Sequence, residues 1–305
     1  MLPLQVFGVP GAGAEDVLVD AQGWVITGTE DGSVFRVQPD GAKIERLGQT
    51  GGRPLGLELL PDGRILVCDA KRGLIALDPT TGRVEDLVTQ FRERPLRFCN
   101  NAAVASSGEI WFSDTSTRYG IDHWKSDMVE VTRTGRLFRR DVDGQVTQVL
   151  DGLHFANGVA VSADESFVVV AETGARTVAR LWLSGDRAGQ RDYFAQDLPG
   201  YPDNVSRGTD GLIWVTIASP KDPVVERLQR APLAVRRAVT RIPEALQPQP
   251  KRTVRVQAFN DAGVLIHDLS GDSTRFHMAT GVREHDGKVW LGSLHEPAVA
   301  VMSLG

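Results

Sequence analysis

The stretch FANGVAVSADESFVVVAETG, residues 155–174, holds two runs typical of β-strands, VAV and FVVVAE, joined by the turn SADES. An Asn-Gly pair ordinarily makes a hairpin turn, yet Asn157 and Gly158 precede the first run and do not join the two. Asn157 therefore has a role other than turning the chain. The same plan of run, turn and second run recurs along the sequence.

Six blocks share this plan. They begin at Ala14, Pro54, Cys99, Ala156, Pro202 and Ala279. Five of them carry a glycine turn, namely DAQG, LPDG, ASSG, GTDG and EHDG. Repeats of this kind are typical of a β-propeller, so we predict an all-β fold, a six-bladed β-propeller, as a single domain over residues 1–305. Residues 2–9 are expected to complete the blade that contains residues 298–304, which closes the ring. A pair of two-sheet β-sandwiches is the alternative architecture.

One segment departs from the repeat, between the fifth block and the strand at 253–259. Over residues 222–251 the apolar residues recur at a mostly helical spacing, interrupted by Pro232 and Pro243. We interpret it as a helical insertion in blade 5. It forms either a surface cap on one blade or a lid over the channel. Its arginines, Arg230, Arg236, Arg237 and Arg241, are interpreted as a solvated face.

Composition excludes several classes of partner. The net charge is −5, and no long basic block indicates nucleic acid or a polybasic membrane anchor. No run approaches the roughly 18 apolar residues of a membrane span, and the start has no signal-peptide pattern. We expect a cytoplasmic protein that binds a small molecule and no membrane; the sequence leaves its oligomeric state open. Cys68 and Cys99 are expected to be buried free thiols.

The residues just before the first strand of each block can converge on the axis of a propeller. They are Glu15, Leu55, Asn100, Asn157, Asp203 with Asn204, and Val282. Four of the six positions carry side-chain oxygens, with two carboxylates among them. Hard oxygen ligands of this kind suit Ca²⁺, with another divalent cation as the alternative. The sequence therefore predicts a cation in the central channel, and Asn157 would be one of its ligands.

Several motifs resemble a known family. They are GAED (13–16), FCNNAAVASSGEIWFSD (98–114), FANGVAVSADE (155–165), LPGYPDNVSRGTDGLIWV (198–215) and REHDGKVWLGSL (283–294). Together they resemble the senescence marker protein/gluconolactonase superfamily, and most closely its strictosidine synthase-like branch, which includes adipocyte plasma membrane-associated protein. The resemblance implies a six-bladed propeller with a channel cation and the hydrolysis of lactones or esters. It implies calcium ligands at Glu15, Asn100, Asn157 and Asp203, and a further one at Asn204.

Two places depart from relatives in this superfamily. Strictosidine synthase depends on a glutamate four positions before the Glu of the EHDG motif, and Thr280 stands there. The resemblance also implies a histidine in paraoxonases at the start of block two, where this chain has Leu55. A condensation reaction and a histidine base are therefore both disfavoured.

The function that we predict is a Ca²⁺-dependent hydrolysis of lactones or small esters, in which the metal polarises the carbonyl. Asp203 is the expected general base and His154, near the metal, the expected assisting residue. His123 and His295 are expected to contact the substrate. A condensing enzyme or lyase of the strictosidine synthase type, and a non-catalytic ligand-binding propeller, are the alternatives.

Overall fold

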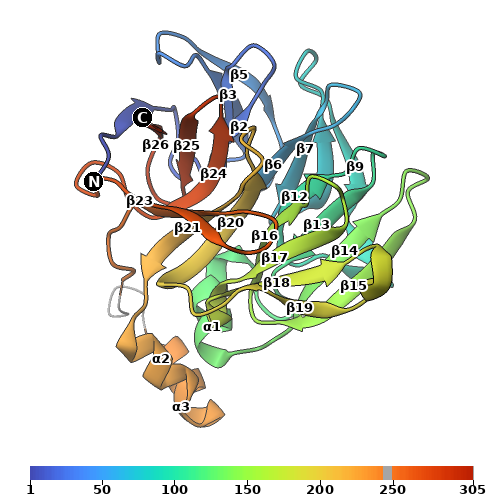
Figure 1. Cartoon of the computed structure of the whole chain (residues 1–305), viewed down its shortest axis with the longest axis vertical. Helices are drawn as coiled ribbons and strands as arrows, with labels where there is room; N and C mark the ends of the chain where they lie inside the picture. Colours follow the sequence, from blue (N-terminus) through green and yellow to red (C-terminus); the bar gives the residue numbers. More distant parts are fainter. Residues whose placement is uncertain (243–248, 305) are drawn as a thin grey trace.

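The computed structural model describes residues 1–242 and 249–304. Six four-stranded antiparallel sheets stand around a central axis, as Figure 1 shows, which confirms the predicted six-bladed propeller. Part of the predicted insertion, residues 243–248, lies outside the described residues.

The strands follow one another from the axis outward in each blade. Blade 1 is β2 (Leu18–Val19), β3 (Val25–Gly28), β4 (Ser33–Val37) and β5 (Ile44–Gln49); blade 2 is β6 (Pro54–Leu59), β7 (Ile65–Asp69), β8 (Gly73–Leu77) and β9 (Val84–Val88). Blade 3 is β12 (Cys99–Val104), β13 (Ile110–Asp114), β14 (Gly135–Arg140) and β15 (Val146–Leu153); blade 4 is β16 (Ala156–Val161), β17 (Phe167–Glu172), β18 (Thr177–Trp182) and β19 (Arg191–Ala195). Blade 5 is β20 (Gly200–Arg207), β21 (Ile213–Pro220), β22 (Arg255–Phe259) and β23 (Leu265–Ser270). A small hairpin, β10 (Gln90–Phe91) with β11 (Arg94–Pro95), separates blades 2 and 3.

The last blade joins the two ends of the chain. Its strands are β24 (Ala279–His285), β25 (Lys288–Ser293), β26 (Ala298–Ser303) and β1 (Gln5–Gly8). β1 pairs with β26 in antiparallel register, with Gln5 opposite Val301 and Gly8 opposite Ala298. The expected closure of the ring is therefore confirmed, and the termini lie near each other in Figure 1.

The core lies between neighbouring blades. Every residue of the middle strands β7, β13 and β17 is buried, whereas the outermost strands β5 and β23 alternate exposed and half-buried residues. One apolar cluster joins Val169 of blade 4 to Val215 of blade 5. Burying both faces of each sheet in this way is the main stabilising contribution of the ring. Cys68 and Cys99 are buried free thiols, as expected.

In blades 2, 3 and 4 an acidic residue at the end of the second strand binds the backbone at the start of the first strand. Asp69, Asp114 and Glu172 accept hydrogen bonds from the backbone N–H groups of Arg53, Phe98 and His154, at 2.9, 2.8 and 3.0 Å. These residues are buried, so an unpaired N–H there would be costly. The bonds hold the first strands of blades 2, 3 and 4 in register with their neighbours.

The helices lie at the end of the ring where first strands begin. Because strands alternate in direction, the connection from the second to the third strand emerges at that end. In blade 3 it carries the 3₁₀ turn η1 (Ile121–His123) and α1 (Trp124–Glu130); in blade 5 it carries α2 (Pro223–Gln229) and α3 (Leu233–Thr240). Two other 3₁₀ turns, η2 (Thr173–Ala175) and η3 (Gly185–Arg187), belong to blade 4. Among the described residues no helix is long and apolar enough to cross a membrane.

Gly158 allows the first strands of blades 4 and 5 to meet. A Cβ there would stand 2.1 Å from the Val205 backbone nitrogen and 2.5 Å from the Asn204 carbonyl carbon. We expect Gly158→Ala to lower the free energy of unfolding by about 3 kcal/mol, because backbone atoms cannot yield as a side chain can. Chemical denaturation measures it. Gly8→Ala is the matched control, because its Cβ would meet nothing closer than 3.9 Å; equal losses in both variants would contradict the argument.

Candidate functional site

Six residues, one from each blade, form the floor of a cavity on the propeller axis. They are Glu15, Leu55, Asn100, Asn157, Asp203 and Thr280. In blades 2 to 6 the register of the first strand shifts at this place, for example between Ala156 and Val159. The bulge turns the floor residue toward the axis while the rest of the strand stays paired. The floor is thus a repeated backbone feature whose side chain varies among the blades, with asparagine in both blades 3 and 4.

The sixth floor residue differs from the expectation. The sequence alignment of the blocks placed Val282 there, but Val282 is buried in the apolar core of blade 6. Thr280, two residues earlier, lines the cavity and donates to the Glu15 backbone oxygen at 2.8 Å. Ala279-Thr280-Gly281-Val282 is identical to Ala156-Asn157-Gly158-Val159 at three of four positions, and Thr280 stands at the place of Asn157. That match was the signal that would have identified Thr280.

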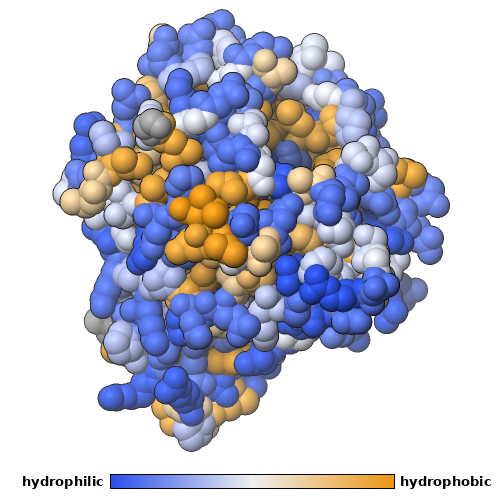
Figure 2. All heavy atoms as spheres, in the orientation of Figure 1, coloured by the Kyte–Doolittle hydropathy of each residue, from blue (hydrophilic) through white to orange (hydrophobic). Residues whose placement is uncertain are grey.

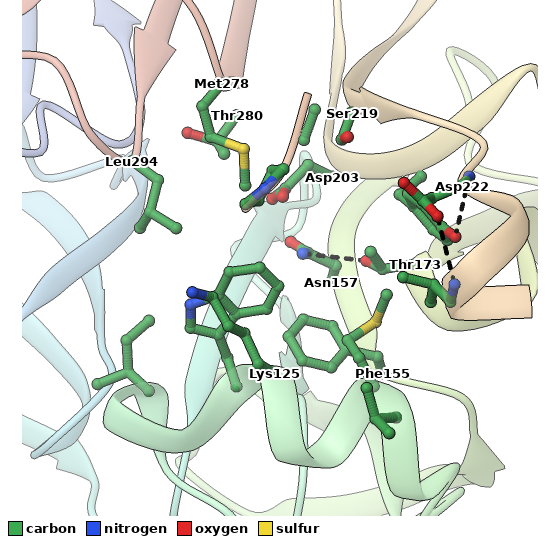
Figure 3. A pocket seen from close by; sticks show the side chains of 18 of the residues that line it. Lys125, Phe155, Asn157, Thr173, Asp203, Ser219, Asp222, Met278, Thr280 and Leu294 are labelled. Carbon is green, nitrogen blue, oxygen red and sulfur yellow. Dashed lines mark hydrogen bonds between the residues drawn. The ribbon is translucent and has the colours of Figure 1, made fainter. Parts of the chain in front are cut away.

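Two amide side chains of the floor, and a third next to it, have oxygens without a hydrogen-bond partner among the described residues. Asn100 donates its Nδ2 to Thr115 at 2.9 Å, and Asn157 donates to Thr173 at 3.2 Å, as the dashed line in Figure 3 shows. Asn204, beside Asp203, donates to Glu15 at 3.2 Å. Within the described residues the Oδ1 atoms of all three are buried and accept no hydrogen bond. A buried oxygen without a donor is costly, so these atoms are poised to bind a positively charged group.

The acids of this region are buried together. Burial, followed by the charges of Asp16 and Asp203, raises the pKa of Glu15 well above its ordinary value, against the opposing charge of Arg53. Burial also raises the pKa of Asp203 to about 7, although the neighbouring Asn157 side chain lowers it in part. Asp16 lies next to Glu15, and burial raises its pKa to about 6. Negative charge on this floor is therefore unfavourable unless a cation accompanies it.

The walls of the cavity are mostly apolar. We call α1, α2 and α3 the lid, because all three contribute side chains to the cavity, which measures about 140 Å³. Trp124 and Met128 of α1 and Val225 of α2 pack with Phe98 and Phe155 of the propeller. Figure 3 shows α1 running along one side of the cavity, opposite Met278 and Thr280. The described helices of the predicted insertion thus contribute to the cavity wall, and the loop of blade 3 does the same.

Glu130, at the end of α1, holds the two halves of the lid together. Its carboxylate accepts from the Tyr119 hydroxyl at 2.6 Å, from Thr240 at 3.3 Å and from Arg237 at 3.4 Å, and its backbone oxygen accepts from Arg236. Two of the arginines that we interpreted as solvated therefore bind the neighbouring helix. This arrangement positions α3 over the cavity.

The three expected histidines do not line the cavity with the floor residues. His154 is buried beside Gly174, and burial lowers its pKa to about 4, so its ring is neutral at pH 7. His123 is exposed at the start of α1. His295 is exposed next to Leu294, a wall residue, and its ring meets His277 at 5.6 Å. The structure thus brings together Glu15, Asn100, Asn157, Asp203 and Asn204, and it leaves the histidines at its margin.

The floor fits a hard divalent cation better than a soft one. Among the residues that the structure describes, no three His, Cys, Asp or Glu side chains stand so that they could hold a metal ion. A cation on this floor would rely on two carboxylates and on the unpaired amide oxygens of Asn100, Asn157 and Asn204. Oxygen-only donors of mixed charge are typical of calcium sites.

The comparisons with known proteins agree with this architecture. A family model described as "Strictosidine synthase" matches residues 100–186, and one described as "Strictosidine synthase-like, N-terminal" matches residues 6–37. Strictosidine synthase-like protein 10 of Arabidopsis thaliana is 36% identical over 267 residues, which cover 83% of this chain and 70% of that protein. The chain belongs to the strictosidine synthase-like family. Adipocyte plasma membrane-associated protein of Rattus norvegicus is 30% identical over 307 residues, 92% of this chain and 80% of that protein.

Solved structures place this strictosidine synthase-like chain among gluconolactonase-like propellers. A gluconolactonase from Xanthomonas campestris superposes with a TM-score of 0.72 at 18% identity, over 99% of this chain and 89% of that one. A luciferin-regenerating enzyme gives a TM-score of 0.70 at 15% identity, over 100% and 96% of the two chains. At these identities the likeness concerns the fold. The two family models include Glu15, Asn100 and Asn157 of the floor.

The raised pKa values predict that a cation and protons compete for the floor. A carboxylate whose pKa is raised from 3.8 to about 7 favours the folded state when protonated. Stability from Asp203 is therefore greatest below pH 4, and the metal-free protein loses it as the pH rises through 7. At pH 6 we expect calcium to displace on the order of one proton and to bind more tightly as the pH rises. Titration calorimetry in two buffers of different ionisation enthalpy measures the number of protons released on calcium binding. Identical heats in the two buffers would show that none is released and would contradict the prediction.

Proposed function

We propose that this protein is a Ca²⁺-dependent hydrolase of lactones or small apolar esters. The observation that carries the proposal is the floor itself, where the buried, unpaired amide oxygens of Asn100 and Asn157 stand with two carboxylates at the end of an apolar cavity, and Asn204 contacts one of those carboxylates. A gluconolactonase among the structural neighbours supports a reaction of this class.

The cation would be held by Glu15, Asp203 and the amide oxygens of Asn100, Asn157 and Asn204. When bound, it supplies a Lewis acid for the carbonyl oxygen of the substrate. We give Asp203 both roles, that of a ligand and that of the base, as the resemblance to lactonases implies. A bound cation lowers its pKa below the metal-free value of about 7, which limits its strength as a base.

The chain's own residues perform the proton transfer. The Asp203 carboxylate accepts a proton from water while the water oxygen bonds to the carbonyl carbon. The tetrahedral centre then collapses, the bond from carbon to the ring or ester oxygen breaks, and the proton passes to that leaving oxygen. Asn157, whose amide is fixed by Thr173, keeps its oxygen directed at the floor during these steps. Thr280 stands where a condensing enzyme needs a glutamate, and a hydroxyl does not replace that acid.

The walls indicate which substrates fit. The space above the floor is surrounded by Phe98, Phe155, Trp124 and Val225. These apolar walls favour the burial of an acyl chain or an aromatic ring of the substrate. A sugar lactone would leave its hydroxyl groups without partners against these side chains.

A panel of γ- and δ-lactones and aryl esters, assayed in calcium, tests the proposal. We expect turnover that increases from acetyl to butyryl esters and from unsubstituted to alkyl-substituted lactones. The same panel includes amine–aldehyde pairs as substrates of a condensing enzyme. Consumption of those pairs without any lactone or ester hydrolysis, or no turnover at all, would contradict the proposed function.

A further inference from the structure

Helix α3 turns its charged face inward and its apolar face outward. Arg236 and Arg237 contact Glu130 of α1, and Val239 lines the cavity. The opposite face carries Ala234, Ala238 and Ile242, which recur every four residues and are exposed. A helix on the surface of a soluble protein ordinarily shows the reverse arrangement, with its apolar stripe toward the core.

The exposed apolar side chains of α2 and α3 form one region, which we call the lid patch. Its apolar members, with the exposed fraction of each residue, are Val224 (54%), Leu233 (41%), Val235 (46%) and Ile242 (40%). The same segment carries the exposed Arg227 of α2 and, at the ends of α2 and α3, the exposed Arg230 and Arg241. Figure 1 shows α2 and α3 projecting from the ring, and Figure 2 shows apolar atoms at the lower tip of that projection beside hydrophilic ones.

Charge distinguishes the lid patch from the rest of the protein. Between Lys221 and Ile242 the chain carries six lysines or arginines against two acids, whereas the whole chain carries 34 against 39. We propose that the lid patch docks on the surface of an anionic lipid bilayer. Its apolar side chains would enter the interface while the arginines reach lipid phosphates, as in other surface-bound amphipathic helices.

The shape and the charge of the patch favour a bilayer over another protein. A second copy in a two-fold contact would set the same arginines of both chains against each other. The helices that carry the patch project from the ring, so they can reach a deformable surface that admits side chains. From the sequence we expected no membrane partner, because the net charge is negative and no apolar run is long enough to span a bilayer. Both properties describe the whole chain and not this local patch.

Docking here would place the cavity at the bilayer. Val225 and Leu228 of α2 and Val239 of α3 line the cavity, and so does Val224 of the lid patch, whereas Leu233, Val235 and Ile242 are exposed and do not line it. The lid would then lie between lipid and floor. This inference concerns binding and stands whether or not the protein hydrolyses esters.

Vesicle co-sedimentation tests the inference with the full chain. We expect binding to vesicles of 70% phosphatidylcholine and 30% phosphatidylglycerol, at least about tenfold above binding to pure phosphatidylcholine. Leu233→Asp with Val235→Asp should remove about nine-tenths of the bound protein, and Arg230→Glu with Arg241→Glu should remove the preference for the anionic lipid.

The matched control is Val142→Asp. Val142 is 68% exposed and lies in the turn between β14 and β15, at the opposite end of the ring from the lid. Circular dichroism confirms that each variant is folded. Two outcomes overturn the inference: equal binding of the wild type and the Leu233–Val235 variant, or a concentration-dependent dimer that the lid substitutions abolish in sedimentation velocity.

Discussion

Asp203→Asn is expected to slow lactone or ester hydrolysis about a thousandfold, the size of effect typical of a general base. The substitution keeps the shape of the side chain and removes its negative charge, and with it the ability to accept a proton. Because burial raises the pKa of Asp203 to about 7, its charge opposes folding at neutral pH in the metal-free protein. The neutral amide should therefore leave that form at least as stable as the wild type. Steady-state kinetics and thermal melting in chelator measure the two effects.

Leu55→Met is the matched control for this variant. Leu55 belongs to the same floor, but it has no oxygen and takes part in no proton transfer. We expect it to keep most of the activity, within about tenfold of the wild type. If Asp203→Asn retained as much turnover as Leu55→Met, Asp203 would not be the base and the proposed chemistry would fail.

Removal of calcium is expected to abolish hydrolysis and to lower the melting temperature. Without the cation, the acids at positions 15, 16 and 203 stand buried near one another, with Arg53 and Arg283 as opposing charges. A cation present at about a thousand times its dissociation constant adds about 4 kcal/mol to the stability of the folded state. Thermal melting and turnover, each with calcium and with excess chelator, measure both effects in one preparation.

Asn157→Ala distinguishes the effect of losing the bound cation from unspecific effects of the chelator on the melting temperature. The alanine removes one unpaired oxygen and the hydrogen bond to Thr173, while the strand that holds it remains paired. This variant should gain less from calcium than the wild type gains. A melting temperature that is the same in calcium and in chelator for the wild type would show that the floor holds no cation.

The repeat made the ring and most of the floor predictable. Runs of β-branched residues, separated by turns such as LPDG and GTDG, identify the strands because each buried sheet needs them. Once the blocks are aligned, equivalent positions must lie at equivalent places around the axis. Glu15, Asn100, Asn157 and Asp203 follow directly. The acids Asp69, Asp114 and Glu172 recur in the same way at the end of second strands, where they accept backbone hydrogen bonds.

The features of the site that the sequence did not predict depend on the direction in which side chains point and on the local conformation of the backbone. His154 was chosen because it precedes Asn157 by three residues, but residues an odd number apart in an extended chain point to opposite sides. Phe155, between them, has a φ of 64°, which turns the chain further. Helix α1 was not anticipated, although Trp124 and Met128 stand four residues apart on one face. Nothing in a single helix reveals that Glu130 will bind α3.

The pairing of β1 with β26 also determines how the protein would respond to a mechanical load. Gln5 and Val301 lie opposite each other at the edge nearest both termini, and Gly8 and Ala298 lie at the far edge. A force applied to the two ends would break the hydrogen bonds between these strands one after another, as a zipper opens, and would not shear them all at once. The molecule is therefore weakest under tension at the seam that makes it a ring.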